Sequence, residues 1–244
     1  MLVTSYSDAD LEARVRHAYS IRGVNVRGAE GAASSQAVAA AMPEVKEPLF
    51  VAAFDKGLDA TLYNGGAARA RRHGKARVTD GALDLRQGGY VTFDHRGDFD
   101  LGRPITVECW VHVTRKGAMP VVVCCGHWQQ AGWFLQRIGD GWRWHVGGID
   151  CDGGKPAIGR WTHLVCSYDG QRARLFQDGR LVAEMGGQAV RTAWGGRLYV
   201  GQYGAPGPGF QVTGWVSGVK VYSRCLPAKD VAKAFGDKPK PRGK

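Results

Sequence analysis

The chain has 244 residues, 36 of them glycine and eight tryptophan, and carries a formal net charge of +11. A chain of this length can bury one sizeable core, and this composition suits short strands joined by tight turns. No apolar run approaches the roughly 20 residues of a membrane-spanning helix, so the sequence predicts no transmembrane segment.

The first 48 residues differ in composition from the rest. The segment "SDADLEARVRHAYS", residues 7–20, predicts a helix, because Ser7 can cap its start and Leu11 and Val15 fall on one stripe. Residues 28–48 are rich in Ala, Gly and Ser and predict a linker or a weak helix. We therefore expect a helical extension with a linker over residues 1–48, able to contact a protein partner, a second copy or the rest of the chain.

From residue 49 onward, short apolar runs alternate with turn residues. Such regular spacing predicts a sandwich or barrel of antiparallel strands. The stretch "LPAKDVAKAF" predicts a short C-terminal helix with Pro227 in its first turn. We expect a β domain over residues 49–236 and a basic, disordered tail over residues 237–244. The runs that predict strands include "LFVAAF", "YVTF", "ITVECWVHV", "MPVVVCC", "GWFLQRI", "WRWHV" and "RLYVG".

The stretch "WTHLVCSYDGQRARLFQDGRLVAEM", residues 161–185, contains two Asp-Gly pairs. Asp-Gly favours the positive φ angles of a two-residue type I′ hairpin turn. The runs 164–168, 173–176 and 181–183 therefore predict three successive antiparallel strands. A sheet of this kind presents one apolar face, which needs a second layer to bury it.

Six cysteines allow fifteen disulfide connectivities, and the sequence does not choose among them. Cys109 and Cys166 both lie in predicted strands and are the first pair to consider for a disulfide. Reduced, buried thiols are the alternative, and the one expected of a cytosolic chain.

The order of "GALDLRQGGYVTFDH", "FDLGRPITVECWVHV", "GRWTHLVCSYDGQRARLFQDGRLVAE", "LYVGQYG" and "GWVSGVKVYSRCL" resembles the laminin-G-like, concanavalin A-like jelly roll, including the related pentraxins. The resemblance covers roughly residues 49–235. It implies an all-β, two-layer antiparallel sandwich that acts chiefly as an extracellular module binding glycans or proteins. Pentraxins join the two strands corresponding to those of Cys109 and Cys166 by a disulfide, but both cysteines here are displaced by about one position.

The same resemblance implies two further possibilities, a bound calcium ion and glycoside hydrolase activity. Family members often carry an acidic pair before the last strand, where this chain has Ser217 and Gly218; Asp55 and Asp59 could still contribute calcium ligands. A retaining glycosidase needs two carboxyls about 5–5.5 Å apart. "ITVECWVHV" offers one acid, and the acids at 150 and 152 lie in a Gly-rich stretch that predicts a turn. We therefore expect no enzyme activity and no cofactor apart from calcium, with a glycoside hydrolase as a minor alternative.

Aromatic residues in predicted loops are the candidates for stacking on a sugar ring. They are Trp128 with its neighbour His127, Trp194, and Tyr203. The cluster "RARRHGKAR" could supply a cationic side to the same surface, because Arg binds carboxylate or sulfate through two hydrogen bonds. The cationic candidates are Arg69, Arg71, Arg72 and Lys75.

These observations predict a non-catalytic module that binds a carbohydrate or an acidic polysaccharide at or outside the cell surface. A structural or assembly role, through the sandwich and the N-terminal helix, is the alternative. The sequence has no recognition-helix pattern and no zinc-finger spacing, so it does not indicate nucleic acid as a partner. Cytoplasmic localisation stays open, because Asp8, Asp10 and Glu12 stand where a signal peptide would have its apolar core.

Overall fold

The computed structural model describes residues 16–20, 22–25, 27–35, 37–40, 45–94, 97–190 and 192–236. The chain divides into two compact units, residues 1–44 and 45–244. The predicted basic tail over residues 237–244 and the first part of the predicted helix, residues 7–15, lie outside the described residues.

The first unit contains strands where a helix was expected. β1 (Arg16–Tyr19) pairs with β4 (Ala37–Ala40), and β2 (Arg22–Val24) pairs with β3 (Glu30–Ala33), both antiparallel. The predicted helical extension is therefore wrong for the described residues, and contact with partners through an N-terminal helix has no support. A short helix without tertiary packing is marginal in water. The β2–β3 hairpin instead gains a turn in which the Asn25 side chain accepts the backbone N–H of Ala29, 3.0 Å away.

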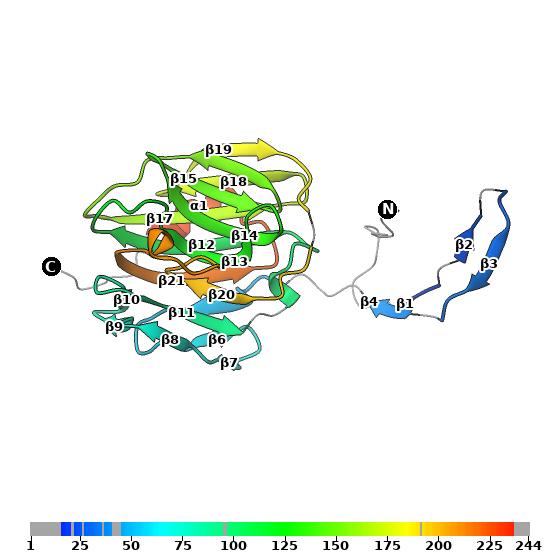
Figure 1. Ribbon diagram of the computed structural model, residues 1–244, viewed down its shortest axis with the longest axis horizontal. Helices are drawn as coiled ribbons and strands as arrows, with labels where there is room; N and C mark the ends of the chain where they lie inside the picture. The colour runs from blue at the N-terminus through cyan, green and yellow to red at the C-terminus, as the bar shows by residue number, and fades with distance from the viewer. Residues whose placement is uncertain are drawn as a thin grey trace. The chain divides into compact units, whose positions relative to one another are not determined.

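The second unit is a two-layer sandwich of antiparallel sheets, as predicted (Figure 1). Eight strands of the ten-stranded sheet follow in the order β19 (Arg180–Gly186), β18 (Arg172–Gln177), β17 (Trp161–Tyr168), β12 (Ile105–Val113), β21 (Gly214–Tyr222), β5 (Phe50–Ala52), β6 (Ala60–Leu62) and β7 (Ala67–Ala68). The other two lie off this path: β10 (Ala82–Asp84) pairs with β21, and β9 (Arg77–Thr79) pairs with β10. The seven-stranded sheet has the order β16 (Ile149–Gly153), β15 (Gly141–Val146), β14 (Ala131–Ile138), β13 (Val121–His127), β20 (Arg197–Val200), β11 (Gly89–Asp94), β8 (Arg71–Gly74). In Figure 1 the labelled strands of each sheet follow this order from top to bottom. Two 3-10 turns, η1 (Gly97–Phe99) and η2 (Pro208–Phe210), lie in the connections.

Period-two alternation along the strands fills the space between the sheets. In β12, Val107, Cys109 and Val111 are buried in the main core, while the residues between them face outward. In β15, Trp142 and Trp144 occupy the same core. Full burial of one large apolar side chain contributes about 1.5–3 kcal/mol, so this alternation fixes which face of each strand points inward.

The predicted meander is β17, β18 and β19, joined by two different turns. At the second Asp-Gly pair, Asp178 and Gly179 have φ angles of 51° and 79°, as a type I′ turn requires. At the first pair only Gly170 has positive φ, and the Asp169 carboxylate accepts the backbone N–H groups of Gln171 and Arg172 at 2.9 and 2.8 Å. The first turn is therefore a three-residue loop capped by an aspartate, not the two-residue turn predicted.

All six cysteines are free thiols in the structure, and five of them are buried. Cys109 pairs in register with Leu164, and Cys166 pairs with Val107, so the two cysteines are diagonal neighbours on the core side. Diagonal partners in a sheet lie about 7–8 Å apart, whereas a disulfide needs Cα atoms within about 7 Å. The structure therefore does not contain the predicted Cys109–Cys166 bond.

The predicted C-terminal helix is α1 (Ala228–Gly236). Its Val231 is fully buried in a cluster with Val165, Phe176 and Tyr222, on the outer face of the ten-stranded sheet. Among the described residues, no helix is long and apolar enough to cross a membrane.

Candidate functional site

The outer face of the seven-stranded sheet carries aromatic and polar side chains in one continuous row. Register places Thr92 beside Tyr199, Tyr199 beside Cys124, and Cys124 beside Phe134. The row continues through His145 to Asp150. Because these residues alternate with the core residues of the same strands, the packing that fills the sandwich also fixes this row on the outside.

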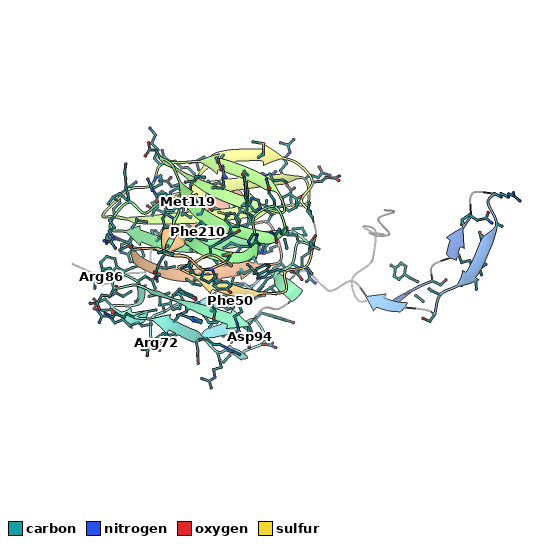
Figure 2. All side chains as sticks on the ribbon, in the orientation of Figure 1. Phe50, Arg72, Arg86, Asp94, Met119 and Phe210 are labelled. Carbon is teal, nitrogen blue, oxygen red and sulfur yellow. The ribbon has the colours of Figure 1, made fainter. Side chains whose placement is uncertain are left out.

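A cavity of about 350 Å³ opens on this face over β13, β14 and β15. Loop residues close it: Met119 and Phe210, labelled in Figure 2, come from the β12–β13 connection and η2, and the Met119 N–H donates to the Gly209 oxygen at 3.0 Å. Its lining is mostly apolar, with polar groups from a few side chains. The residues are Met119, His127, Trp128, Phe134, Gln136, Ile138, Arg143, Tyr203 and Phe210.

Tyr203 stands at the centre of the aromatic lining. Its ring centroid lies 5.4 Å from that of Phe134, 5.0 Å from that of Phe210 and 5.3 Å from the His127 ring. Burial raises the pKa of the Tyr203 hydroxyl. The hydroxyl therefore remains protonated near neutral pH, and it accepts the backbone N–H of Trp128 at 2.6 Å. Tyr203 thus fixes the backbone of Trp128, which lies at the rim of the cavity.

The turn between β13 and β14 presents Trp128 to solvent. The side chains on either side hold its backbone: Tyr203 accepts from Trp128, and His145 Nε2 accepts the N–H of Gln129 at 3.4 Å. Gln129 adopts a left-handed φ of 56°. Trp128 itself is 48% exposed, far more than a packed indole. A large ring held by its backbone but left open on one face can stack on a ligand.

Arg143 and two aspartates form the polar side of the site. The Arg143 guanidinium contacts Asp150 at 2.9 Å and Asp152 at 2.6 Å, and His145 Nδ1 lies 2.5 Å from Asp150. The two aspartates lie on strand β16, so the turn predicted for them is wrong; alternation with buried Cys151 places both on the outer face. Hydrogen bonding to Asp152 raises the pKa of Arg143, so both aspartates face a permanent cation.

Of the predicted ligand-binding residues, His127, Trp128 and Tyr203 meet in this cavity. Trp194 does not line it: its Nε1–H donates to the Arg197 oxygen at 2.8 Å, and its ring packs against Gly204, next to Tyr203. Trp194 therefore packs against the loop that carries Tyr203 and stabilises it without lining the cavity.

The predicted cationic cluster lies at the far edge of the sheet, separated from β13 by β20 and β11. Arg69 is paired with Asp59 at 2.6 Å, and Arg71 with Asp94 at 3.5 Å, while Arg72 and Lys75 are exposed. Asp94 also pairs with Arg197. Two of the four cations thus already contact carboxylates, and one of those carboxylates, Asp94, is shared with Arg197.

The residues proposed for calcium do not fit a calcium site. Asp59 accepts the Arg69 guanidinium through Oδ2 and the Ala70 N–H through Oδ1, interactions that lower its pKa, and Asp55 is exposed. Calcium needs six to eight oxygen ligands. Within the described part of the chain, no cluster of three or more His, Cys, Asp or Glu residues could hold a metal ion.

Strand alternation could have indicated some of the residues missed from sequence. The sequence predicts that Trp144 packs in the core and that Trp142 shares its strand face, which places Arg143 and His145 on the opposite face. Met119 and Phe210 come from loops whose path no local pattern fixes.

The sequence pattern of the concanavalin A-like lectin/glucanases superfamily matches residues 85–232, more than half of the chain. The chain belongs to this superfamily. No curated protein matches it in sequence.

Solved structures of this superfamily's fold include several toxin binding domains. The binding domain of botulinum neurotoxin serotype D/C is 10% identical to this chain, with a TM-score of 0.61. The aligned region covers 78% of this chain and 52% of the neurotoxin domain. The binding domain of Paraclostridial Mosquitocidal Protein 1 is 12% identical, with a TM-score of 0.60 and coverages of 78% and 52%. The botulinum neurotoxin DC binding domain in complex with SialylT is 11% identical, with a TM-score of 0.59 and coverages of 78% and 50%. This concanavalin A-like chain thus spans about half the length of these structures, and the likeness shows the fold.

Proposed function

We propose that the protein is a non-catalytic module that binds carbohydrate in the cavity over β13–β15. The observation that carries this proposal is the half-exposed Trp128 ring at the rim of an aromatic cavity of about 350 Å³. Gln136 and Arg143 add hydrogen-bonding groups to this apolar lining, a combination typical of small-ligand sites. Structural neighbours support the proposal: they are binding domains, and one was solved with SialylT.

The charges on this face favour a neutral sugar over an acidic one. Arg143 faces Asp150 and Asp152, and Arg197 faces Asp94, so each guanidinium meets a carboxylate. An acidic ligand here would compete with these aspartates for the same donors. Localisation at or outside the cell surface, where such ligands are displayed, belongs to the same proposal.

The site's carboxylates support binding rather than hydrolysis. A glycosidase needs two carboxyls that flank the glycosidic bond and are free to act on it. Asp150 and Asp152 instead both contact the Arg143 guanidinium, at 2.9 and 2.6 Å, so each carboxylate is already held in an ion pair.

A glycan array read with the wild-type chain and two variants tests the proposal. Replacement of Trp128 by Ala should weaken binding to the selected neutral glycan about tenfold or more, since stacked aromatic anchors commonly contribute about 1.4 kcal/mol or more. Tyr63→Ala is the matched control, because Tyr63 is also 48% exposed and does not line the cavity. Equal affinities for wild type and Trp128→Ala would refute the site. No signal from any glycan would refute the function, and signal from acidic glycans alone would refute the preference for a neutral sugar.

A further inference from the structure

The opposite side of the sandwich carries a separate group of cavities. Helix α1 packs on the outer face of the ten-stranded sheet, and an open cavity lies on each side of it, of about 540 and 660 Å³. Lys233 and Ala234 of the helix line the first cavity, and Phe235 lines the second. The Phe235 ring stacks on Trp110, at 5.8 Å, so the two cavities share one aromatic wall.

Four cations line the first cavity: Lys46, Lys220, Arg224 and Lys233. Two carboxylates accompany them, Glu108 and Asp230.

Glu108 is already satisfied within the protein. It is 1% exposed and accepts from Lys220 Nζ at 2.8 Å and from the Tyr222 hydroxyl at 3.0 Å. Burial raises the pKa of Glu108, but its interactions with His163 and Lys220 outweigh burial and bring that pKa below its usual value. The carboxylate is therefore ionised and neutralises Lys220, which leaves three cations against Asp230.

Arg224 is held in place without a carboxylate partner. Its Nε donates to the Lys46 oxygen at 3.1 Å, and its guanidinium lies 5.9 Å from the centre of the Tyr222 ring. Over the described residues, no carboxylate lies within ion-pair distance of Lys46, Arg224 or Lys233. The remaining N–H groups of Arg224 can therefore bind an incoming anion through two hydrogen bonds.

The second cavity also has more cations than carboxylates in its lining. Lys155, Arg160 and Arg180 line it, with Asp178 as the carboxylate. Asp178 is engaged, because it contacts Arg160 at 3.4 Å and accepts the backbone N–H of His163 at 3.0 Å. Lys155 and Arg180 have no carboxylate partner in the part of the chain that the structure describes.

We propose that the face around α1 is a second ligand site, for an acidic polysaccharide chain whose sulfate or carboxylate groups occupy both cavities. Two cation-lined cavities separated by one helix suit a linear polymer with repeated anionic groups. The aromatic rings here do not favour nucleic acid, since Trp110 and Tyr222 are buried and half-buried Phe235 is stacked on Trp110, so no series of open rings is available for successive bases. This site replaces the Arg69–Lys75 cluster as the candidate for acidic ligands.

Heparin affinity tests this proposal independently of the neutral-sugar site. In one variant, Lys46, Lys155, Arg180 and Lys233 are replaced by Gln. In the control, Lys56, Arg72, Lys75 and Arg103 are replaced by Gln. All eight residues are exposed, and both variants lose the same charge. Thermal unfolding of each variant confirms that it is folded.

We expect the first variant to bind a heparin oligosaccharide on the order of tenfold more weakly than the control variant, with a shallower dependence on salt, because fewer counterions are released. An equal loss of heparin affinity in both variants would show that only the total charge of the protein matters, and it would overturn the site. Tighter binding of single-stranded DNA than of heparin, at equal salt, would overturn the choice of polysaccharide. The first variant should keep its affinity for the neutral glycan, and Trp128→Ala should keep its affinity for heparin.

Discussion

His145, on the outer face of the seven-stranded sheet, supports the rim of the neutral-sugar cavity. It is 1% exposed, its ring stacks on Phe134 at 4.5 Å, and its two nitrogens contact Asp150 and the backbone N–H of Gln129. Since Nε2 accepts from Gln129, the proton of the neutral ring resides on Nδ1 and points to Asp150. Protonation of Nε2 would remove the acceptor that holds the turn carrying Trp128.

This geometry predicts a loss of sugar binding in acid. Burial lowers the pKa of His145 below the usual 6.5, and Asp150 offsets this only in part. The unfolded chain therefore takes up the proton first, so the free energy of unfolding falls as pH drops from about 6.5 toward the folded-state pKa. Protonation of His145 in the folded chain follows the lowered pKa itself, so we expect glycan affinity to fall as pH drops through that pKa, measured by calorimetry from pH 8 down to the lowest pH at which the chain stays folded. Equal affinity at both ends of that range would contradict this role.

His73 provides the control for this pH effect. Burial, with Arg197 and Arg71, lowers its pKa as well, but it lies on β8, away from the cavity. His73→Gln should therefore reduce the pH dependence of stability while leaving that of glycan binding unchanged.

At the scale of elements, the β13–β14 hairpin positions the aromatic rim. Gly126 pairs with Gly132, and the backbones there approach so closely that a Cβ on Gly132 would collide with the Cys125 oxygen. Gly132 also has a φ of 66°, a left-handed conformation that costs a residue with a Cβ about 1–2 kcal/mol. The two glycines thus determine how the turn with Trp128 leaves the sheet.

Substitution of this glycine should therefore disturb both stability and binding. We expect Gly132→Ala to lower the free energy of unfolding by about 2 kcal/mol or more and to weaken glycan binding. Gly139→Ala is the control, because Gly139 also has a positive φ of 53° but has open space around it, so about 1 kcal/mol is expected. Denaturant melts measure both, and equal costs would show that the close contact at Gly132 is not limiting.

Alternation and turn chemistry made the second unit predictable from sequence. The runs from residue 49 onward became strands, and the meander over residues 161–185 and the C-terminal helix were confirmed. Local patterns failed where the outcome depends on partners distant in the chain. Arg16–Tyr19 fits a helical stripe yet pairs with Ala37–Ala40, and Asp150 and Asp152 sit among glycines yet pair with β15. Three candidate aromatic-site residues were predicted because loop aromatics are visible in a sequence; their convergence in one cavity was not.

At the scale of the whole molecule, the interior determines the chemistry of the cysteines. Burial raises the pKa of every cysteine, to about 12 for Cys124 and about 11 for Cys151. Since the thiolate is the reactive form, these residues should be inert in the folded chain. Cys225 is the least buried of the six.

Alkylation followed by intact-mass measurement checks this expectation. The native chain near neutral pH should be modified at Cys225 first and only slowly elsewhere, and all six thiols should react after denaturation without a reductant. Four reactive thiols in the denatured chain, rising to six after reduction, would instead show that the chain contains a disulfide, whose two cysteines peptide mapping would then identify.

The two proposed surfaces lie on the outer faces of different sheets, with the packed core between them. Neither ligand would then obstruct the other, and one molecule could crosslink a neutral glycan to an acidic polymer. Repeated along such a polymer, these junctions would act with high effective concentration, so even weak single contacts could produce firm adhesion between the two materials.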